Sequence, residues 1–138
     1  MSAENVARKP WWRRWFGNRS ERAAVRFLKK LGYRILSRNF SCNLGELDIV
    51  ALDGECIVFV EVRSTGNDDT DRPAQSVDAT KQRKLTRLAL YYLKRYRLLG
   101  RSARYDILAL SWPPGKSEPE IRHYPSAFEP TDRFQMFS

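Results

Sequence analysis

The sequence predicts an α/β domain with a central mixed five-stranded sheet flanked by helices, in the order α-β-β-β-α-β-β. Two segments carry apolar residues at helical spacing, shorter segments between and after them read as strands, and an Asp-Gly pair joins two of those strands. The 138 residues, of which 42% are hydrophobic, are enough for one domain with a core and too few for two.

The first helix is expected to begin at Ser20, a good N-terminal cap, and to end at Gly32, which suits a left-handed C-terminal cap. We therefore expect the domain to span residues 20–128, after a basic, Trp-rich appendage at 1–19 and before a tail at 129–138. The apolar stripe of this helix consists of Ala24, Phe27, Leu28 and Leu31.

Three strands follow at about 33–40, 46–52 and 55–63, and Asp53-Gly54 is suited to a type I′ turn between the last two. Residues 65–73 are typical of a loop. A second helix is predicted from residue 76 or 78 to 96, ended by Gly100, with strands at 105–111 and 120–124 after it. The buried stripe of the second helix is predicted to be Leu85, Leu88, Tyr92 and Tyr96.

Positive charge is concentrated in two places. Residues 1–40 hold eleven Lys or Arg against two acids, and nine basic residues with no acid lie between Asp78 and Asp106. Such blocks suit a polyanion, because neutralising phosphates releases counterions. Each block taken alone equally fits a solvated helix face.

Other classes of site and location are disfavoured. The apolar runs are far shorter than the ~20 residues that a membrane span needs. Cys42 and Cys56 have no metal-binding spacing, so we expect free thiols in a cytoplasmic protein and no zinc. The Trp/Arg-rich segment at 10–16 fits a membrane interface, stacking on bases or a cover for the core, and these alternatives stay open.

The hairpin is the most informative motif. With Asp53 and Gly54 as the turn, Asp48 pairs with Phe59 and Glu46 with Glu61, so three carboxylates and Arg63 share one face at the open end. Crowded carboxylates destabilise a strand pair unless a cation binds them, and Mg²⁺ takes one or two carboxylates plus water and phosphate oxygens. Solvated acids with one paired to Arg63 are the alternative.

The runs Gly45-Glu46-Leu47-Asp48-Ile49-Val50-Ala51 and Val58-Phe59-Val60-Glu61-Val62-Arg63 resemble the YraN-like family of bacterial proteins. That family is similar to the PD-(D/E)xK, or restriction-endonuclease-like, nucleases near the Holliday-junction resolvases. Around the hairpin the resemblance extends over about residues 20–128, through Glu21, Arg38-Asn39, the segment from Ser76-Val77-Asp78 to Lys81-Gln82, and Arg104-Tyr105-Asp106.

The resemblance implies Mg²⁺- or Mn²⁺-dependent hydrolysis of a phosphodiester. It implies that Asp48 and Glu61 hold the metal, that Glu46 is a further acid of the catalytic group, and that Glu21 and Gln82 support the site. Arg63 stands where the superfamily has a catalytic lysine, and a guanidinium cannot act as a base, although it can bind a phosphate. Lys81, Arg83, Lys84 and Arg87 are the candidate phosphate contacts.

Three hypotheses follow. The first is a metal-dependent nuclease acting on DNA rather than RNA, on branched or repair intermediates. The second is a non-catalytic nucleic-acid-binding module that keeps the nuclease fold, and the third is a domain held at a membrane surface by residues 1–19. By analogy with resolvases, we also expect a homodimer.

Overall fold

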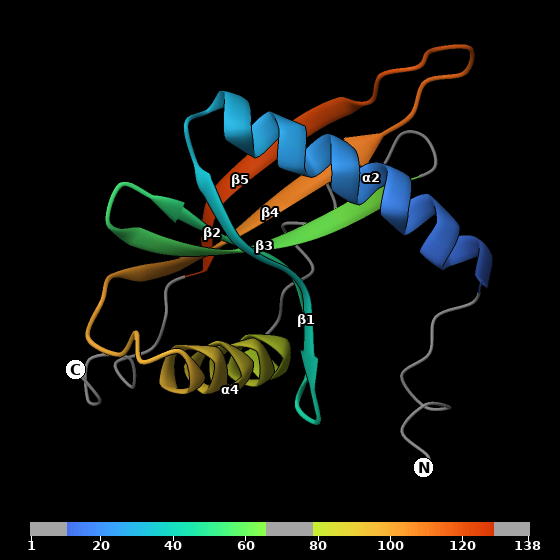
Figure 1. Ribbon diagram of the computed structural model, residues 1–138. Coiled ribbons are helices and arrows are strands. Elements are labelled where there is room, and N and C mark those ends of the chain that lie inside the picture. Colours follow the sequence, from blue (N-terminus) through green and yellow to red (C-terminus); the bar gives the residue numbers. More distant parts are fainter. Residues whose placement is uncertain (1–10, 66–78, 129–138) are drawn as a thin grey trace.

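The computed structural model describes residues 11–65 and 79–128, and the side chains of residues 19–64 and 79–127. One five-stranded sheet in the order β1-β2-β3-β4-β5 lies between two helices (Figure 1). The elements in chain order are α2 (Trp11–Lys30), β1 (Arg34–Cys42), β2 (Gly45–Asp53), β3 (Cys56–Thr65), α4 (Ala79–Arg95), β4 (Ala103–Ser111) and β5 (Glu120–Phe128). The predicted fold class and element order are therefore confirmed.

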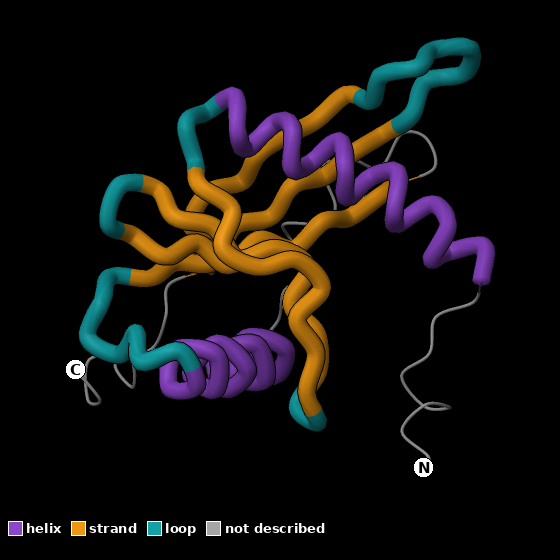
Figure 2. The backbone as a smooth tube through the Cα atoms, in the orientation of Figure 1, coloured by secondary structure: helices purple, strands orange, loops and turns teal. Residues whose placement is uncertain are grey.

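The sheet is mixed, as predicted. Strands β3 and β4 pair in parallel, while every other neighbouring pair is antiparallel. A parallel pair needs a crossover connection, and α4 lies within the segment that joins β3 to β4. Figure 2 shows the two helices on opposite sides of the strands.

Each helix covers its own apolar cluster. Ala24 and Leu28 of α2 are fully buried against a sheet face that includes Val58 and Leu108. Leu85, Leu88, Ala89, Tyr92 and Leu93 of α4 pack on the other face. Both faces of the central strands are therefore dry, and a charged side chain there must find a partner.

The predicted start of the first helix and the predicted end of the second need correction. Helix α2 begins at Trp11, so Ser20 is an interior residue rather than a cap, and the predicted appendage is helical from residue 11. No proline interrupts the sequence from Trp11 to Ser20. The second helix ends at Arg95, and Arg97 rather than Gly100 provides the left-handed cap, with φ of 57° and a Leu98 N–H donated to the Leu93 carbonyl.

The C-terminal cap of α2 and most of the residues in the two buried stripes are as predicted. Gly32 has φ of 93°, and Tyr33 N–H donates to the Leu28 carbonyl, as in a Schellman cap. Leu31 and Tyr96, however, are 48% and 46% exposed, because each lies at a helix end beyond the edge of the cluster. The predicted loop at 66–73, the start of the second helix at 76–78 and the tails at 1–10 and 129–138 lie outside the described residues.

Candidate metal and nucleic-acid site

The β2–β3 hairpin is in a different register from the one predicted. Asp53 pairs with Cys56 and Val50 with Phe59, so Gly54 and Glu55 are the central turn residues. Gly54 alone of these two has positive φ, at 60°, as a type II′ turn requires. The predicted pairs Asp48–Phe59 and Glu46–Glu61 are therefore wrong. The shift is an even number of residues, so the side chains of β3 keep the faces predicted for them.

Counted from the turn, the regular β2–β3 pairing stops one residue short of Asp48. Its last pair is Ile49–Val60, and beyond it the Asp48 carboxylate replaces a backbone acceptor, with Val62 N–H donating to Asp48 Oδ2 at 2.8 Å. Leu47 packs in the α4-side cluster, as Val50 does, while Ile49 between them packs on the α2 side. Strict alternation would place Leu47 with Ile49, so the strand is irregular at Asp48. This irregularity places the Asp48 carboxylate against the peptide that follows Glu61.

Glu61 has one paired oxygen and one unpaired oxygen. Arg63 Nε donates to Glu61 Oε2 at 2.9 Å, and Lys81 Nζ from α4 lies 3.6 Å from the same atom. Glu61 Oε1 is buried and accepts no hydrogen bond from any residue in the described ranges. A buried carboxylate oxygen without a donor is costly, and a bound cation would remove that cost.

Tyr105 of β4 lies among these charged groups. Burial raises the pKa of the Tyr105 hydroxyl well above its ordinary value, and the negative charges of Glu61 and Asp48 raise it further, while Arg63 lowers it. Both carboxylates are thus close enough to act on one hydroxyl. In the sequence, Tyr105 belongs to the family resemblance but has no predicted role in the site.

The two other predicted acids lie apart from this pair. Glu46 is exposed, stands opposite Ser41 of β1, and by alternation points away from the cluster that holds its neighbour Leu47. Glu21 is buried in α2 and contacts β1, accepting a 3.2 Å bond from Asn39 and lying 3.8 Å from Arg38. In the described part of the chain, no three His, Cys, Asp or Glu side chains gather as a metal-binding group. The predicted convergence of three acids at the hairpin end is therefore corrected to two.

Helix α4 brings the predicted basic residues toward the same end. Lys81 and Gln82 are half-buried in its first turn, where Lys81 reaches Glu61. Arg83, Lys84 and Arg87 are exposed one and two turns further on. The two carboxylates, Arg63 and the cationic start of α4 thus form one site at the end of the hairpin opposite its turn.

A second charged cluster, which the sequence analysis did not identify, lies on the α2 side of the sheet. Asp106 of β4 is fully buried and accepts bonds from Arg104 Nε at 3.0 Å, from Ser126 N–H at 2.9 Å and from His123 Nε2 at 2.8 Å. Arg104 also donates to Asp53 at 3.1 Å and to the Tyr33 hydroxyl at 2.7 Å.

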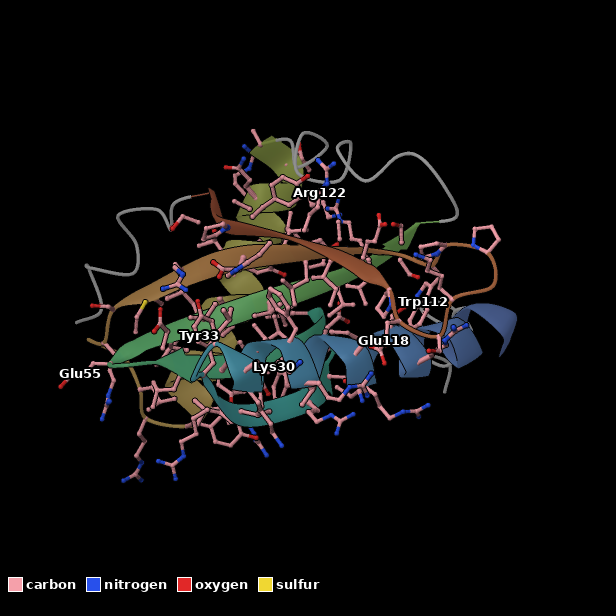
Figure 3. The ribbon with its side chains drawn as sticks, turned by 90° about the horizontal axis from the view of Figure 1, so that it is seen from above. Lys30, Tyr33, Glu55, Trp112, Glu118 and Arg122 are labelled. Carbon is pink, nitrogen blue, oxygen red and sulfur yellow. The ribbon has the colours of Figure 1, made fainter. Side chains whose placement is uncertain are left out.

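In this cluster Arg104 joins β4 to Asp53 at the end of β2 and to Tyr33, which lies between α2 and β1 and is labelled in Figure 3. Every oxygen and donor named here has a partner within the protein, so we interpret the cluster as structural. The signal for it in the sequence was an aspartate inside the apolar run of β4, two residues after an arginine.

A set of hydrogen bonds at the middle of α2 is also structural. Trp112 Nε1 donates to Ser20 Oγ at 3.0 Å, and Ser20 Oγ donates to Ser64 Oγ at 3.0 Å. Figure 3 shows Trp112 and Glu118, from the turn between β4 and β5, beside α2. These contacts fix the helix that carries Glu21.

Together the fold and the site define an α/β domain with a mixed five-stranded sheet, consistent with a nuclease-like fold, and with Asp48 and Glu61 at the end of a central hairpin. The sequence profile described as "Uncharacterised protein family UPF0102" matches residues 20–110. The chain belongs to this family, as the YraN-like resemblance predicted.

Several relatives carry the same family name. A UPF0102 protein of Moorella thermoacetica is 50% identical over 98 residues, which cover 71% of this chain and 82% of that protein. UPF0102 proteins of Geobacter metallireducens and Myxococcus xanthus are each 41% identical, over 82% and 85% of this chain and 91% of each relative. The region that the family profile matches includes the hairpin, α4 and all of β4 except its last residue.

Two further predictions concern the state of the cysteines and the absence of a membrane-spanning helix. Cys42 and Cys56 are both free thiols, as predicted. Neither of the helices in the described ranges is long and apolar enough to cross a membrane.

Proposed function

We propose that this protein is a metal-dependent nuclease of the PD-(D/E)xK type, acting on DNA. The observation that carries the proposal is the end of the hairpin. There the Asp48 carboxylate accepts a hydrogen bond from the N–H of Val62, the residue after Glu61, and Glu61 Oε1 is buried without a hydrogen-bond donor among the described residues. Burying a carboxylate oxygen without a hydrogen-bond donor is costly, and a bound cation would offset that cost.

The donor set fits Mg²⁺ or Mn²⁺. These cations bind one or two carboxylates and complete their coordination with water and phosphate oxygens, so Asp48 and Glu61 are sufficient protein ligands. When bound, the metal would supply Lewis-acid polarisation of a phosphoryl oxygen and a water of lowered pKa. We assign no ligand role to Glu46, whose side chain is exposed and faces away.

Arg63 and Lys81 have different roles in this proposal. The Arg63 guanidinium is permanently charged, so it holds Glu61 in position and stabilises negative charge on a phosphate without accepting a proton. Lys81 is 42% exposed and only 3.6 Å from Glu61 Oε2, so its ammonium can move from the carboxylate to a substrate phosphate. Lys81 thereby places an amine beside the position where the superfamily has its lysine.

The nucleic acid would approach along α4. Arg83, Lys84 and Arg87 are exposed on it and continue from Lys81, which suits contact with successive phosphates. We expect DNA in preference to RNA and, by analogy with junction resolvases, a two-fold assembly that acts on branched intermediates.

The test is cleavage of linear, nicked and four-way DNA by the purified chain with Mg²⁺ or Mn²⁺. Asp48→Asn and Glu61→Gln are expected to reduce cleavage at least about a hundredfold, since even residues that only support a metal ligand cost 10–100-fold. Glu46→Gln is the matched control, because it removes an acid from the same strand, two residues from Asp48. It is expected to retain most of the activity.

Two outcomes would contradict the proposal. No cleavage of any substrate with either metal, together with salt-dependent binding that neither chelator nor Asp48→Asn changes, would favour the non-catalytic binding module. An equal loss in Glu46→Gln would show that three acids, not two, serve the site. Calorimetric titration with Mn²⁺ separates metal binding from catalysis, because the binding module predicts no site that depends on Asp48 and Glu61.

A further inference from the structure

Helix α4 carries an exposed stripe that starts at the candidate site and ends at a cluster of aromatic rings. From Lys81, the exposed residues Lys84, Arg87, Tyr91 and Arg95 follow at intervals of three or four, so they lie along one face of the helix. The distance from Lys81 to Tyr91 along the helix axis is about 15 Å, at ~1.5 Å per residue. The stripe is therefore continuous from Glu61 to the aromatic cluster.

The aromatic cluster contains two rings of α4, the ring of Tyr96 directly after the helix, and one ring of β1. Phe40 of β1 lies with its ring centre 6.2 Å from Tyr91, 5.1 Å from Tyr92 and 6.2 Å from Tyr96. In Figure 1 the far end of β1 curls down beside α4, which brings Phe40 to this helix. Tyr92 is buried in the core, but Tyr91 and Tyr96 are 38% and 46% exposed.

Cations accompany the exposed rings. The Arg95 guanidinium carbon lies 5.6 Å from the centre of the Tyr96 ring. No acid occurs in the sequence between Asp78 and Asp106, although nine basic residues do. The surface therefore offers aromatic faces within a strongly positive field, which attracts polyanions.

The positive charge and the exposed aromatic rings together indicate which kind of ligand this surface binds. A second copy of this face would bring like charges together, so self-association through it is disfavoured. Duplex nucleic acid would satisfy the cations but keeps its bases stacked inside. A single strand offers phosphates to the cations and unpaired bases to Tyr91 and Tyr96.

We propose that the exposed face of α4 binds single-stranded nucleic acid, with phosphates on Lys84 and Arg87 and unpaired bases stacked on Tyr91 and Tyr96. This surface directs a strand from the aromatic cluster toward the Asp48–Glu61 end of the hairpin. The preferred substrate then has an unpaired segment about 15 Å from the point of chemistry. The inference rests on the proposed function only in taking nucleic acid as the ligand, and it does not require cleavage.

The test compares three fluorescein-labelled strands in the presence of chelator: a thymidine strand, a uridine strand and an abasic strand with the same phosphates. Binding of the full chain is followed by anisotropy. The wild type is expected to bind both base-bearing strands about tenfold or more tightly than the abasic strand, because stacking needs bases while charge does not. A difference between the thymidine and uridine strands would report the 2′-hydroxyl and the thymine methyl group together.

Variants assign the effect to the two rings. The double variant Tyr91→Leu/Tyr96→Leu keeps apolar bulk and is expected to weaken thymidine-strand binding about tenfold, with abasic binding unchanged. The matched Tyr91→Phe/Tyr96→Phe variant keeps both rings and should bind as the wild type does. Circular dichroism establishes that each variant is folded.

The result that overturns the inference is equal wild-type affinity for the thymidine and abasic strands, which needs no variant. An equal loss on both strands in the leucine variant overturns it as well. Base-dependent binding that survives in Asp48→Asn, with no cleavage by any form, would refute the nuclease and leave this inference standing. Cleavage without base-dependent binding would do the reverse.

Discussion

The buried aspartate of β4 offers the sharpest test of what stabilises this fold. Asp106 is fully buried, and its carboxylate accepts bonds from Arg104, His123 and Ser126 N–H. Asp106→Asn keeps the size and one acceptor oxygen, but it removes the charge and turns an amide NH₂ toward donors. His123 Nε2 can accept from that NH₂ in its other tautomer, but Arg104 Nη2, which donates to Asp106 Oδ2 at 3.3 Å, loses its acceptor and the guanidinium loses its buried counter-charge.

The expected cost is about 3–5 kcal/mol, the usual result of removing one member of a buried ion pair. For a domain of this size, that cost lowers Tm by on the order of 10–20 °C. Asp53→Asn is the matched control, because Asp53 bonds the same Arg104 at 3.1 Å but its side chain is 43% exposed. That pair is at the surface, so its loss costs at most about 1 kcal/mol.

Urea unfolding followed by circular dichroism measures both variants. The reasoning is refuted if Asp106→Asn costs no more than Asp53→Asn, since burial would then have no bearing on the cost of losing an Arg104 partner. A large, equal cost for both would place the stabilisation in Arg104 itself. In that case the aspartate on β4 would not be the essential partner.

The Asp106 carboxylate also predicts how the free energy of unfolding decreases at acid pH. Burial alone would raise the pKa of Asp106, but the bonds from His123, Arg104 and Ser126 outweigh it and lower that pKa below the ordinary value. A lowered folded-state pKa means that the contribution is complete above about pH 4, the unfolded value, and is lost as the pH falls through the folded value. Asp106→Asn should therefore flatten the loss of stability below pH 4.

Three further changes have defined outcomes. Tyr92→Phe removes the 2.6 Å bond between its hydroxyl and Ser37 Oγ and should cost about 1 kcal/mol in urea unfolding, with Ser37→Ala adding nothing in the double variant. Gly45→Ala should lower stability by about 1–3 kcal/mol, because φ of 141° is a glycine region and the new Cβ would lie 3.4 Å from Leu88 Cδ2; an unchanged Tm would contradict this. Arg63→Lys should raise the rate of metal-dependent DNA cleavage several-fold, because an amine can orient or activate water; a lower rate would show that the guanidinium serves the reaction better.

The sequence determined the order of elements because its signals are local. Helical spacing around Leu28 and around Leu88, and the left-handed cap at Gly32, depend on residues within a few positions of one another. The Asp53-Gly54 pair identified the hairpin correctly. It did not fix the register, since a turn centred one residue later leaves every β3 side chain on the same face.

Only the tertiary structure decided the composition of the candidate site. Strict alternation placed Glu46, Asp48 and Glu61 together. The strand is irregular at Asp48, whose carboxylate accepts a hydrogen bond from the Val62 N–H. Glu46 is left exposed and points away from Asp48 and Glu61. No local pattern distinguishes a regular strand from one that a side chain caps in this way.

The distant partners were equally hidden from the sequence. Lys81 meets Glu61 across 20 positions of chain, and Phe40 meets Tyr96 across 56. The sequence alone determined which residues can carry charge, bind phosphate or cover a core, because those properties belong to side chains. The fold decided which of them meet, because burying both faces of one sheet brings together residues that the chain keeps far apart.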